Sequence, residues 1–298
     1  MNKKQIAHLG LLGTNLFFAI NLSAVKYLTG NNFMQPFGMN VIRVGVSVLL
    51  FWLLFLFYPS EKKIARKDTG RIILCALTGI AINQMLFLKG LSLTFSIHAV
   101  LLMLTTPILI TIIAAWILKE KINIYKTLGL LLGISGAVVL ITSGQSSGAG
   151  QNILLGDTLV LINAISYTVY FILVKPLMLK YNPVQVIRLV FTYGLLMVLP
   201  FGWNEFASIQ WESFGPTEYT CISLITICGT FLAYLFNVYG IKILGASIAG
   251  AYIYIQPVFA TIIAMIFLKE HLEVYKIIAA VLIFAGVYLC NKTRNSAK

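Results

Sequence analysis

Arg43 and Arg188 are the only permanent charges that fall well inside the long apolar stretches of this sequence. A guanidinium group presents a planar fork of donors that can bind a carboxylate or a phosphate through two parallel hydrogen bonds. A charge among apolar residues is costly unless it is paired or reaches an aqueous boundary. The two arginines therefore indicate either recognition of an anionic group or a structural role at a boundary, and both interpretations stay open.

The same apolar stretches contain many amides, hydroxyls and aromatic rings. Hydrogen bonds between helices account for part of them, but their number and type also suit a polar organic solute better than a bare ion. One of them, His98, is either a hydrogen-bonded core residue or a group that exchanges a proton. Together with the arginines, the candidate substrate-binding residues are Asn21, Arg43, Gln84, His98, Thr106, Tyr167, Tyr170, Arg188, Tyr234, Asn237, Tyr254 and Gln256.

Pro107 and Pro257 are predicted to fall near the middle of two helices. Proline inside a helix removes one backbone hydrogen bond and frees the carbonyl four residues earlier. We expect a kink at each proline, which acts either as a packing feature or as a hinge.

Little in the sequence indicates catalysis. Gly133-Ile134-Ser135-Gly136 is superficially similar to an intramembrane serine-hydrolase motif, but it overlaps a Gly129-x-x-x-Gly133 pattern that is typical of helix packing. Every acidic residue falls in a loop or near a predicted helix end, so we expect no buried carboxylate that orients His98 or binds a coupling proton or sodium ion. The cysteines show no metal-ligand spacing. We predict no catalytic residue, metal or cofactor, with a serine-hydrolase-like intramembrane enzyme as the alternative.

The composition shows what surrounds these residues. Of the 298 residues, 59% are apolar and 10% are charged, and the mean hydropathy is +0.91, whereas soluble domains have about 45–50% apolar and about 25% charged residues. There is too little polar surface to cover a soluble body, so the lipid bilayer must serve as the solvent. The net charge of +13 comes mostly from basic residues between the apolar stretches, as membrane topology requires, and we expect no nucleic-acid partner.

The charged positions divide the chain into ten apolar segments, each long enough to approach a bilayer span. Alternation typical of barrel strands is missing, so we predict an all-α integral membrane protein. The expected helices are Ile6 to Thr29, Pro36 to Tyr58, Gly70 to Leu93, Phe95 to Leu118, Tyr125 to Ser143, Leu155 to Leu179, Pro183 to Phe201, Thr217 to Ile241, Gly245 to Leu268 and Val274 to Asn291.

The orientation follows from the basic residues between these helices. Sixteen lysines and arginines lie on the side of the two termini, and four lysines lie on the opposite side. Because basic loops stay in the cytoplasm, we predict a multi-pass protein of the cell (inner) membrane with both termini cytoplasmic. Lys3 and Lys4 could begin a cleaved signal peptide, but the long stretch from Ile6 favours an uncleaved first helix.

An internal repeat relates the two halves of the chain with a shift of 150 residues. Pro107 to Ala114 recurs as Pro257 to Ala264, and Leu118-Lys119-Glu120 recurs as Leu268-Lys269-Glu270. Twelve of the thirty positions from Pro107 to Gly136 match without a gap. A looser match relates Asn21, Lys26 and Arg43 to Tyr170, Lys175 and Arg188.

Each half contains five predicted helices, which is an odd number, so equivalent helices must cross the membrane in opposite senses. We predict two inverted five-helix repeats, residues 6–143 and 155–291, joined by a Gly/Ser/Gln-rich linker at residues 144–154. Inverted halves around a central site provide two nearly equivalent conformations, one open to each side, as alternating access requires.

This pattern, in which each five-helix half has a late Pro-x-x-x-Thr helix that ends in Leu-Lys-Glu, resembles the EamA-like transporter family of the drug/metabolite transporter (DMT) superfamily. The resemblance covers nearly the whole chain. It implies ten helices, cytoplasmic termini and a central cavity lined by helices of both halves. Members carry amino acids, sugars, nucleotide sugars and other metabolites, so the resemblance does not give the substrate.

We therefore predict an inner-membrane secondary carrier, an exporter or exchanger of small organic metabolites such as amino acids. Its expected partners are a small-molecule substrate and the lipid bilayer, and a homodimer through glycine-lined helix faces stays open. A membrane receptor or scaffold that transports nothing is a further alternative, which the inverted symmetry disfavours.

Overall fold

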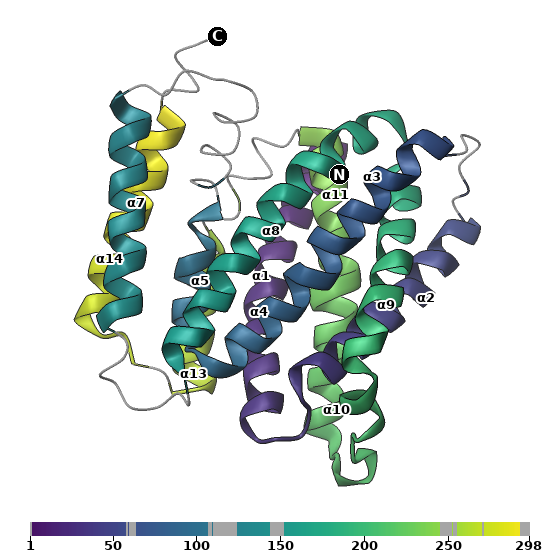
Figure 1. The fold of residues 1–298 in the computed structure, drawn as a ribbon, viewed down its shortest axis with the longest axis horizontal. Helices are drawn as coiled ribbons and strands as arrows, with labels where there is room; N and C mark the ends of the chain where they lie inside the picture. The colour runs from purple at the N-terminus through teal and green to yellow at the C-terminus, as the bar shows by residue number, and fades with distance from the viewer. Residues whose placement is uncertain are drawn as a thin grey trace.

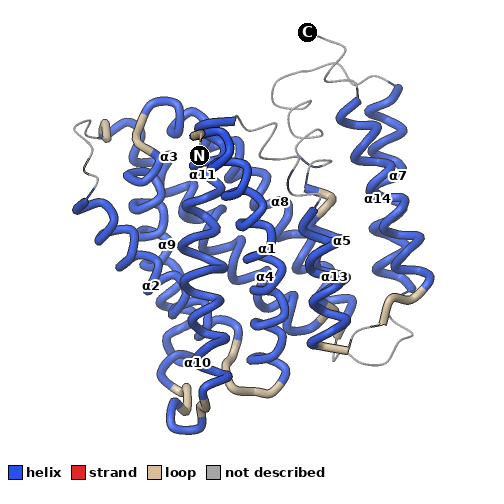
Figure 2. Tube along the Cα trace, turned by 180° about the vertical axis from the view of Figure 1, so that it is seen from behind, coloured by secondary structure: helices blue, strands red, loops and turns tan. Residues whose placement is uncertain are grey.

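The computed structural model describes residues 2–57, 59, 64–106, 109, 124–143, 152–244, 252, 255–269 and 271–292. Within these ranges every regular element is a helix, as Figures 1 and 2 show. Six of the described helices are long and apolar enough to cross a membrane. The expectation of an all-helical membrane protein is therefore confirmed.

The helices of the first half begin and end within a few residues of the predicted bounds where they are described. The third predicted helix is continuous but contains a π-helical segment, Leu77–Ala81. The elements are α1 (Lys3–Gly30), α2 (Pro36–Phe57), α3 (Arg66–Ala76), the π segment, α4 (Ile82–Leu93), α5 (Ser96–Met103) and α7 (Ile124–Ser143).

The second half repeats this order, again with a π-helical segment, Leu224–Leu232, inside its third predicted helix. Its elements are α8 (Ile153–Lys180), α9 (Pro183–Ala207), a 3₁₀ turn (Trp211–Ser213), α10 (Pro216–Ser223), the π segment, α11 (Ala233–Leu244), α13 (Gln256–Phe267) and α14 (Val274–Lys292). Helix α9 continues past the predicted end at Phe201. The extra turns place the Glu205 carboxylate 2.7 and 2.9 Å from the backbone N–H groups of Phe37 and Gly38, at the start of α2.

The two π segments occupy equivalent places, because a shift of 150 residues moves Leu77–Ala81 into Leu224–Leu232. Each contains a glycine that receives a side chain from the other half. A Cβ at Gly79 would lie 2.4 Å from the ring of Tyr170, and one at Gly229 would lie 2.7 Å from Cβ of Asn21. The looser sequence match of Asn21 with Tyr170 thus corresponds to matching contacts across the two halves.

The last helices of the two halves, α7 and α14, pack tightly on each other and stand at one edge of the bundle, opposite the edge formed by α2 and α9 (Figure 1). A Cβ at Gly286 would lie 2.6 Å from the carbonyl oxygen of Gly129, and one at Gly136 would lie 2.9 Å from that of Ala279. These contacts make the two helices antiparallel. The glycine-lined face of α7, which could otherwise form a dimer interface, therefore packs on α14 of the same chain. Small residues allow the two backbones to approach.

Pro257 does not lie where the sequence analysis placed it. It falls in the first turn of α13, which begins at Gln256, and not in the middle of a helix. Proline is favoured in a first turn because its missing N–H has no helical partner there. Pro107, its counterpart, lies outside the described residues.

Candidate functional site

A cavity lies between the two halves of the bundle. It is bordered by the middle of α1, by Arg43 of α2 and by parts of α4, α5, α8, α11 and α13. Eight of the twelve candidate residues line it, namely Asn21, Arg43, Gln84, Thr106, Tyr167, Tyr234, Asn237 and Gln256. Sequence reasoning therefore located most of the polar groups that this cavity contains.

Among the described residues that line the cavity, Arg43 is the charged one. Its side chain is 4% exposed, and its Nε donates to Thr230 Oγ1 at 3.1 Å. The Thr230 hydroxyl in turn donates to the carbonyl oxygen of Ile225 at 2.8 Å, within the second π segment. The Nη1 atom of Arg43 is buried and has no hydrogen-bond partner among the described residues. One arm of the guanidinium is thus fixed, and another nitrogen is left for an acceptor that enters the cavity.

The cavity also contains buried amide oxygens that accept no hydrogen bond from any described residue. They are Oδ1 of Asn21, Oε1 of Gln84 and Oδ1 of Asn163. Gln84 is held by its other end, since its Nε2 donates to Tyr234 Oη at 3.4 Å. Buried polar atoms are normally hydrogen-bonded. Several acceptors without partners near one such donor therefore point to a ligand that carries both donors and acceptors.

Aromatic rings supply the apolar part of the lining. Phe18, Phe87, Tyr167 and Tyr234 all border the cavity. The ring of Tyr234 meets that of Phe18 edge-on, with centroids 6.4 Å apart, and the ring of Phe191 at 5.1 Å. Binding sites for small molecules commonly combine an apolar wall with a few placed polar groups. The cavity has this composition.

Arg188 is outside the cavity, although its position corresponds to that of Arg43. Its guanidinium carbon lies 4.2 Å from the ring centroid of Trp52 and 3.6 Å from that of Phe55. The side chain is 9% exposed. Aromatic faces attract a guanidinium through their quadrupole, so Trp52 and Phe55 hold this group outside the cavity. Its Nε is buried and has no hydrogen-bond partner among the described residues.

The other candidates are placed as follows. Tyr170 is buried against Gly79 and does not border the cavity. His98 is fully buried outside the cavity. Tyr254 lies outside the described residues.

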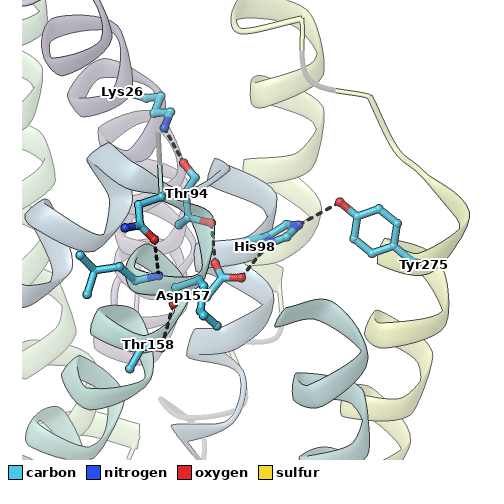
Figure 3. A network of polar contacts seen from close by, with 9 residues as sticks. Lys26, Thr94, His98, Asp157, Thr158 and Tyr275 are labelled. Atoms are coloured by element: carbon cyan, nitrogen blue, oxygen red, sulfur yellow. Dashed lines mark hydrogen bonds and ion pairs between the residues drawn. The ribbon is translucent and has the colours of Figure 1, made fainter. Parts of the chain in front are cut away.

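His98 belongs to a polar cluster that the sequence analysis missed, shown in Figure 3. Its Nδ1 lies 3.0 Å from Oδ2 of Asp157, and both side chains are 0% exposed. Asp157 Oδ1 accepts a further hydrogen bond from Thr94 Oγ1, and His98 Nε2 lies 3.1 Å from the hydroxyl of Tyr275. The expectation of no buried carboxylate, and of no acid beside His98, is therefore wrong.

Close packing of two helices explains the burial of Asp157. It lies near the start of α8, as predicted, but a Cβ at Gly156 would lie 2.9 Å from the carbonyl oxygen of Gly90 in α4. This approach of the backbones brings Thr94 over the carboxylate. Two glycines in the sequence could have indicated this close packing, namely Gly156, directly before Asp157, and Gly90 in the third predicted helix.

Comparisons with known proteins agree with this architecture. The chain matches the EamA-like transporter family over residues 5–142 and again over residues 154–292. It is 25% identical over 244 residues to the uncharacterized transporter YetK of Bacillus subtilis, a match that covers 82% of this chain and 74% of that protein. It is 24% identical to an uncharacterized transporter of Archaeoglobus fulgidus, covering 97% of this chain and 98% of that one. A solved structure described only as "Crystal structure of protein" has a TM-score of 0.65 at 16% identity and covers 100% of this chain and 99% of that chain.

Two copies of one domain, helices apolar enough to cross a membrane, and a cavity between the halves with an apolar wall and a few polar groups define a multi-pass membrane transporter. The chain belongs to the EamA-like transporter family, within the DMT superfamily. It is a transporter and not an enzyme. Membership of a transporter family implies a small-molecule substrate. Ser135 of the hydrolase-like motif is exposed, and its hydroxyl donates a hydrogen bond to the carbonyl oxygen of Leu132 in the same helix.

Proposed function

We propose that the protein carries amino acids or closely related zwitterionic metabolites by alternating access. The observation that carries this proposal is the combination of Arg43 Nη1, a cationic donor, with the amide oxygens of Asn21 and Gln84 in one cavity. The donor suits a substrate carboxylate. The oxygens suit a substrate ammonium group, and the aromatic wall suits an apolar side chain.

The alternating-access part rests on symmetry. We infer ten membrane helices in two inverted repeats, residues 6–143 and 155–291, with residues 144–154 as the linker. The antiparallel packing of α7 on α14 and the matching π segments support this inference. The charge asymmetry supports cytoplasmic termini in the inner membrane, and in that setting the carrier acts as an exporter or exchanger.

A thermal-shift experiment on the purified full chain tests the substrate class. Each of the twenty L-amino acids is compared with its decarboxylated amine and its deaminated acid, which remove one charge at a time. A ligand that binds the folded state raises the unfolding temperature. We expect stabilisation by one or more amino acids and a much smaller effect of both analogues.

The outcome has clear alternatives. Equal stabilisation by an amine and its parent amino acid would exclude Arg43 as a carboxylate site. Stabilisation by sugars or nucleotide sugars alone would exclude the amino-acid class while leaving the carrier function in place.

A further inference from the structure

Arg188 is a permanent charge inside a membrane-spanning helix, and its hydrogen-bonding capacity is unused. It lies in α9, close to the start of the helix at Pro183, on the edge of the bundle that α2 and α9 form (Figure 1). Its Nε is buried, and within the described part of the chain the guanidinium donates no hydrogen bond and pairs with no carboxylate. A charge in this position is costly until an acceptor satisfies it.

Two aromatic rings of α2 hold the guanidinium at a surface that faces lipid. They are the rings of Trp52 and Phe55, on which the cationic carbon of the guanidinium packs. Trp52 is itself fixed, because its Nε1 donates to Thr192 Oγ1 at 3.1 Å. Leu49 and Leu56 lie on the same face of α2 as Trp52 and are 71% and 72% exposed. Exposed leucines on a membrane-spanning helix contact acyl chains, so this face of α2 borders the bilayer.

Arg188 is near enough to the membrane surface for its side chain to reach the lipid phosphates. Helix α9 has 25 residues, which is about 37 Å at 1.5 Å per residue, whereas the hydrocarbon core is about 30 Å thick. In a helix centred in the bilayer, the Cα atom of Arg188 then lies only about 4 Å below the boundary of that core. Helical side chains tilt toward the helix N-terminus, which is the near end here. The guanidinium therefore extends to the headgroup level.

The charges at this end of the bundle favour an anionic headgroup. Helix α3, which packs on α9, brings three exposed basic residues to this end, namely Arg66, Lys67 and Arg71. Its acidic residue, Asp68, accepts hydrogen bonds from Lys180 and Tyr181 at the end of α8, and it does not pair with Arg188. Basic sites between membrane helices bind anionic headgroups. A guanidinium also matches a phosphate through two parallel hydrogen bonds.

We propose that Arg188, framed by Trp52 and Phe55, binds the phosphate of an anionic phospholipid in the leaflet at this end of the bundle. In the proposed orientation this is the cytoplasmic leaflet. The guanidinium donates to the phosphate oxygens, and the exposed face of α2 packs along an acyl chain. The lipid supplies acceptors that the described residues do not, and it joins α2 to α9 from outside. The inference goes beyond the proposed function, because the site is separate from the cavity and needs no substrate.

Fluorescence quenching of Trp52 tests the site. The chain has four tryptophans, and replacing the other three with phenylalanine leaves Trp52 as the reporter beside Arg188. This full-length chain is reconstituted in phosphatidylcholine vesicles that contain either brominated phosphatidylglycerol or brominated phosphatidylcholine with the same acyl chains. Bromine quenches tryptophan only at short range. The ratio of the two quenching constants therefore measures selectivity for the anionic headgroup at this place.

We expect phosphatidylglycerol to be preferred by about fivefold or more, since one basic residue near an anionic lipid contributes roughly that factor. Arg188→Gln should bring the ratio close to one. Arg71→Gln is the matched control, because it removes an exposed positive charge at the same end of the bundle, and it should leave most of the preference. Equal quenching by the two lipids when Arg188 is intact, or equal losses in the two variants, would overturn the proposal.

Soluble glycerol phosphate distinguishes a lipid from a free phosphate. An excess of it should leave quenching by phosphatidylglycerol unchanged, and reversal of the quenching would show that the lipid assignment is wrong. Native mass spectrometry of the chain with all its tryptophans covers the case in which the variants do not fold. Phosphatidylglycerol should stay bound at concentrations where phosphatidylcholine does not, and equal occupancy would overturn the proposal. Because neither measurement uses a transport substrate, a failed amino-acid screen would leave the lipid site standing.

Discussion

Arg43 and Arg188 occupy corresponding places in the two halves of the molecule and have different surroundings. Arg43 points into the cavity with Nε fixed on Thr230 and Nη1 without a described partner. Arg188 lies between the rings of Trp52 and Phe55. The repeat therefore fixes the depth of each arginine in its helix, and the neighbouring side chains decide what it does.

The residue that takes the place of Thr230 in the first half differs in chemistry. A shift of 150 residues relates Thr230 to Ile80 in the first π segment. Ile80 offers no hydroxyl and is buried against Gly194, where a Cβ would lie 2.5 Å from its side chain. The first half thus provides no anchor of the kind that holds Arg43, and the rings of α2 take up Arg188 instead.

Arg43→Gln is the strongest way to break this contrast. It should weaken binding of the amino-acid ligand by about 30-fold or more, because removing one member of a buried charge pair costs about 2–5 kcal/mol. Calorimetric titration of the purified carrier measures the Kd, with Arg188→Gln as the matched control. Equal losses in both variants would mean that the two arginines do not differ in function.

The next largest effect is expected when a methyl group is added to the glycine of each π segment. Gly79→Ala would push on the Tyr170 ring and Gly229→Ala on Asn21, and overpacking of this kind costs about 1–3 kcal/mol. Chemical unfolding should show a loss of stability in both. Only Gly229→Ala should also weaken ligand binding, because Asn21 lines the cavity and Tyr170 does not. The reverse order would place the substrate nearer Tyr170.

Thr230→Val sharpens the account of how Arg43 is held. The variant keeps the shape but removes the oxygen that accepts from Arg43 Nε. Loss of such a bond costs about 1–1.4 kcal/mol, so we expect ligand affinity to fall roughly fivefold to tenfold. An unchanged Kd would show that the guanidinium needs no support from the π segment.

Arg188→Gln should give the smallest effect. The ligand Kd should stay unchanged, while the free energy of unfolding falls by about 1 kcal/mol as the contacts with Trp52 and Phe55 are lost. Denaturant titration measures the loss. A selective drop in affinity for carboxylate-bearing ligands would instead return Arg188 to the binding site.

The sequence was sufficient for those features that depend on spacing along one helix. Hydropathy located the described helices, and the polar residues at membrane depth included Gln84, Tyr234 and Asn237 of the cavity. Features that depend on which helix covers another could not be predicted from the sequence. The burial of Asp157 requires α4 to approach Gly156, and the shielding of Arg188 requires the rings of α2, which no spacing within α9 reveals.

The pairing of α7 with α14 also sets a schedule for biosynthesis. The glycine face of α7 is covered by α14, but about 150 residues separate the end of the first helix from the end of the second. At about 5–20 residues per second of translation, roughly 7–30 s passes before the partner exists. In the proposed ten-helix topology, α7 lies in the bilayer during that interval with its small-residue face uncovered. A ribosome that stalls in the second half would therefore leave an inserted fragment that the membrane quality-control machinery must shield or degrade.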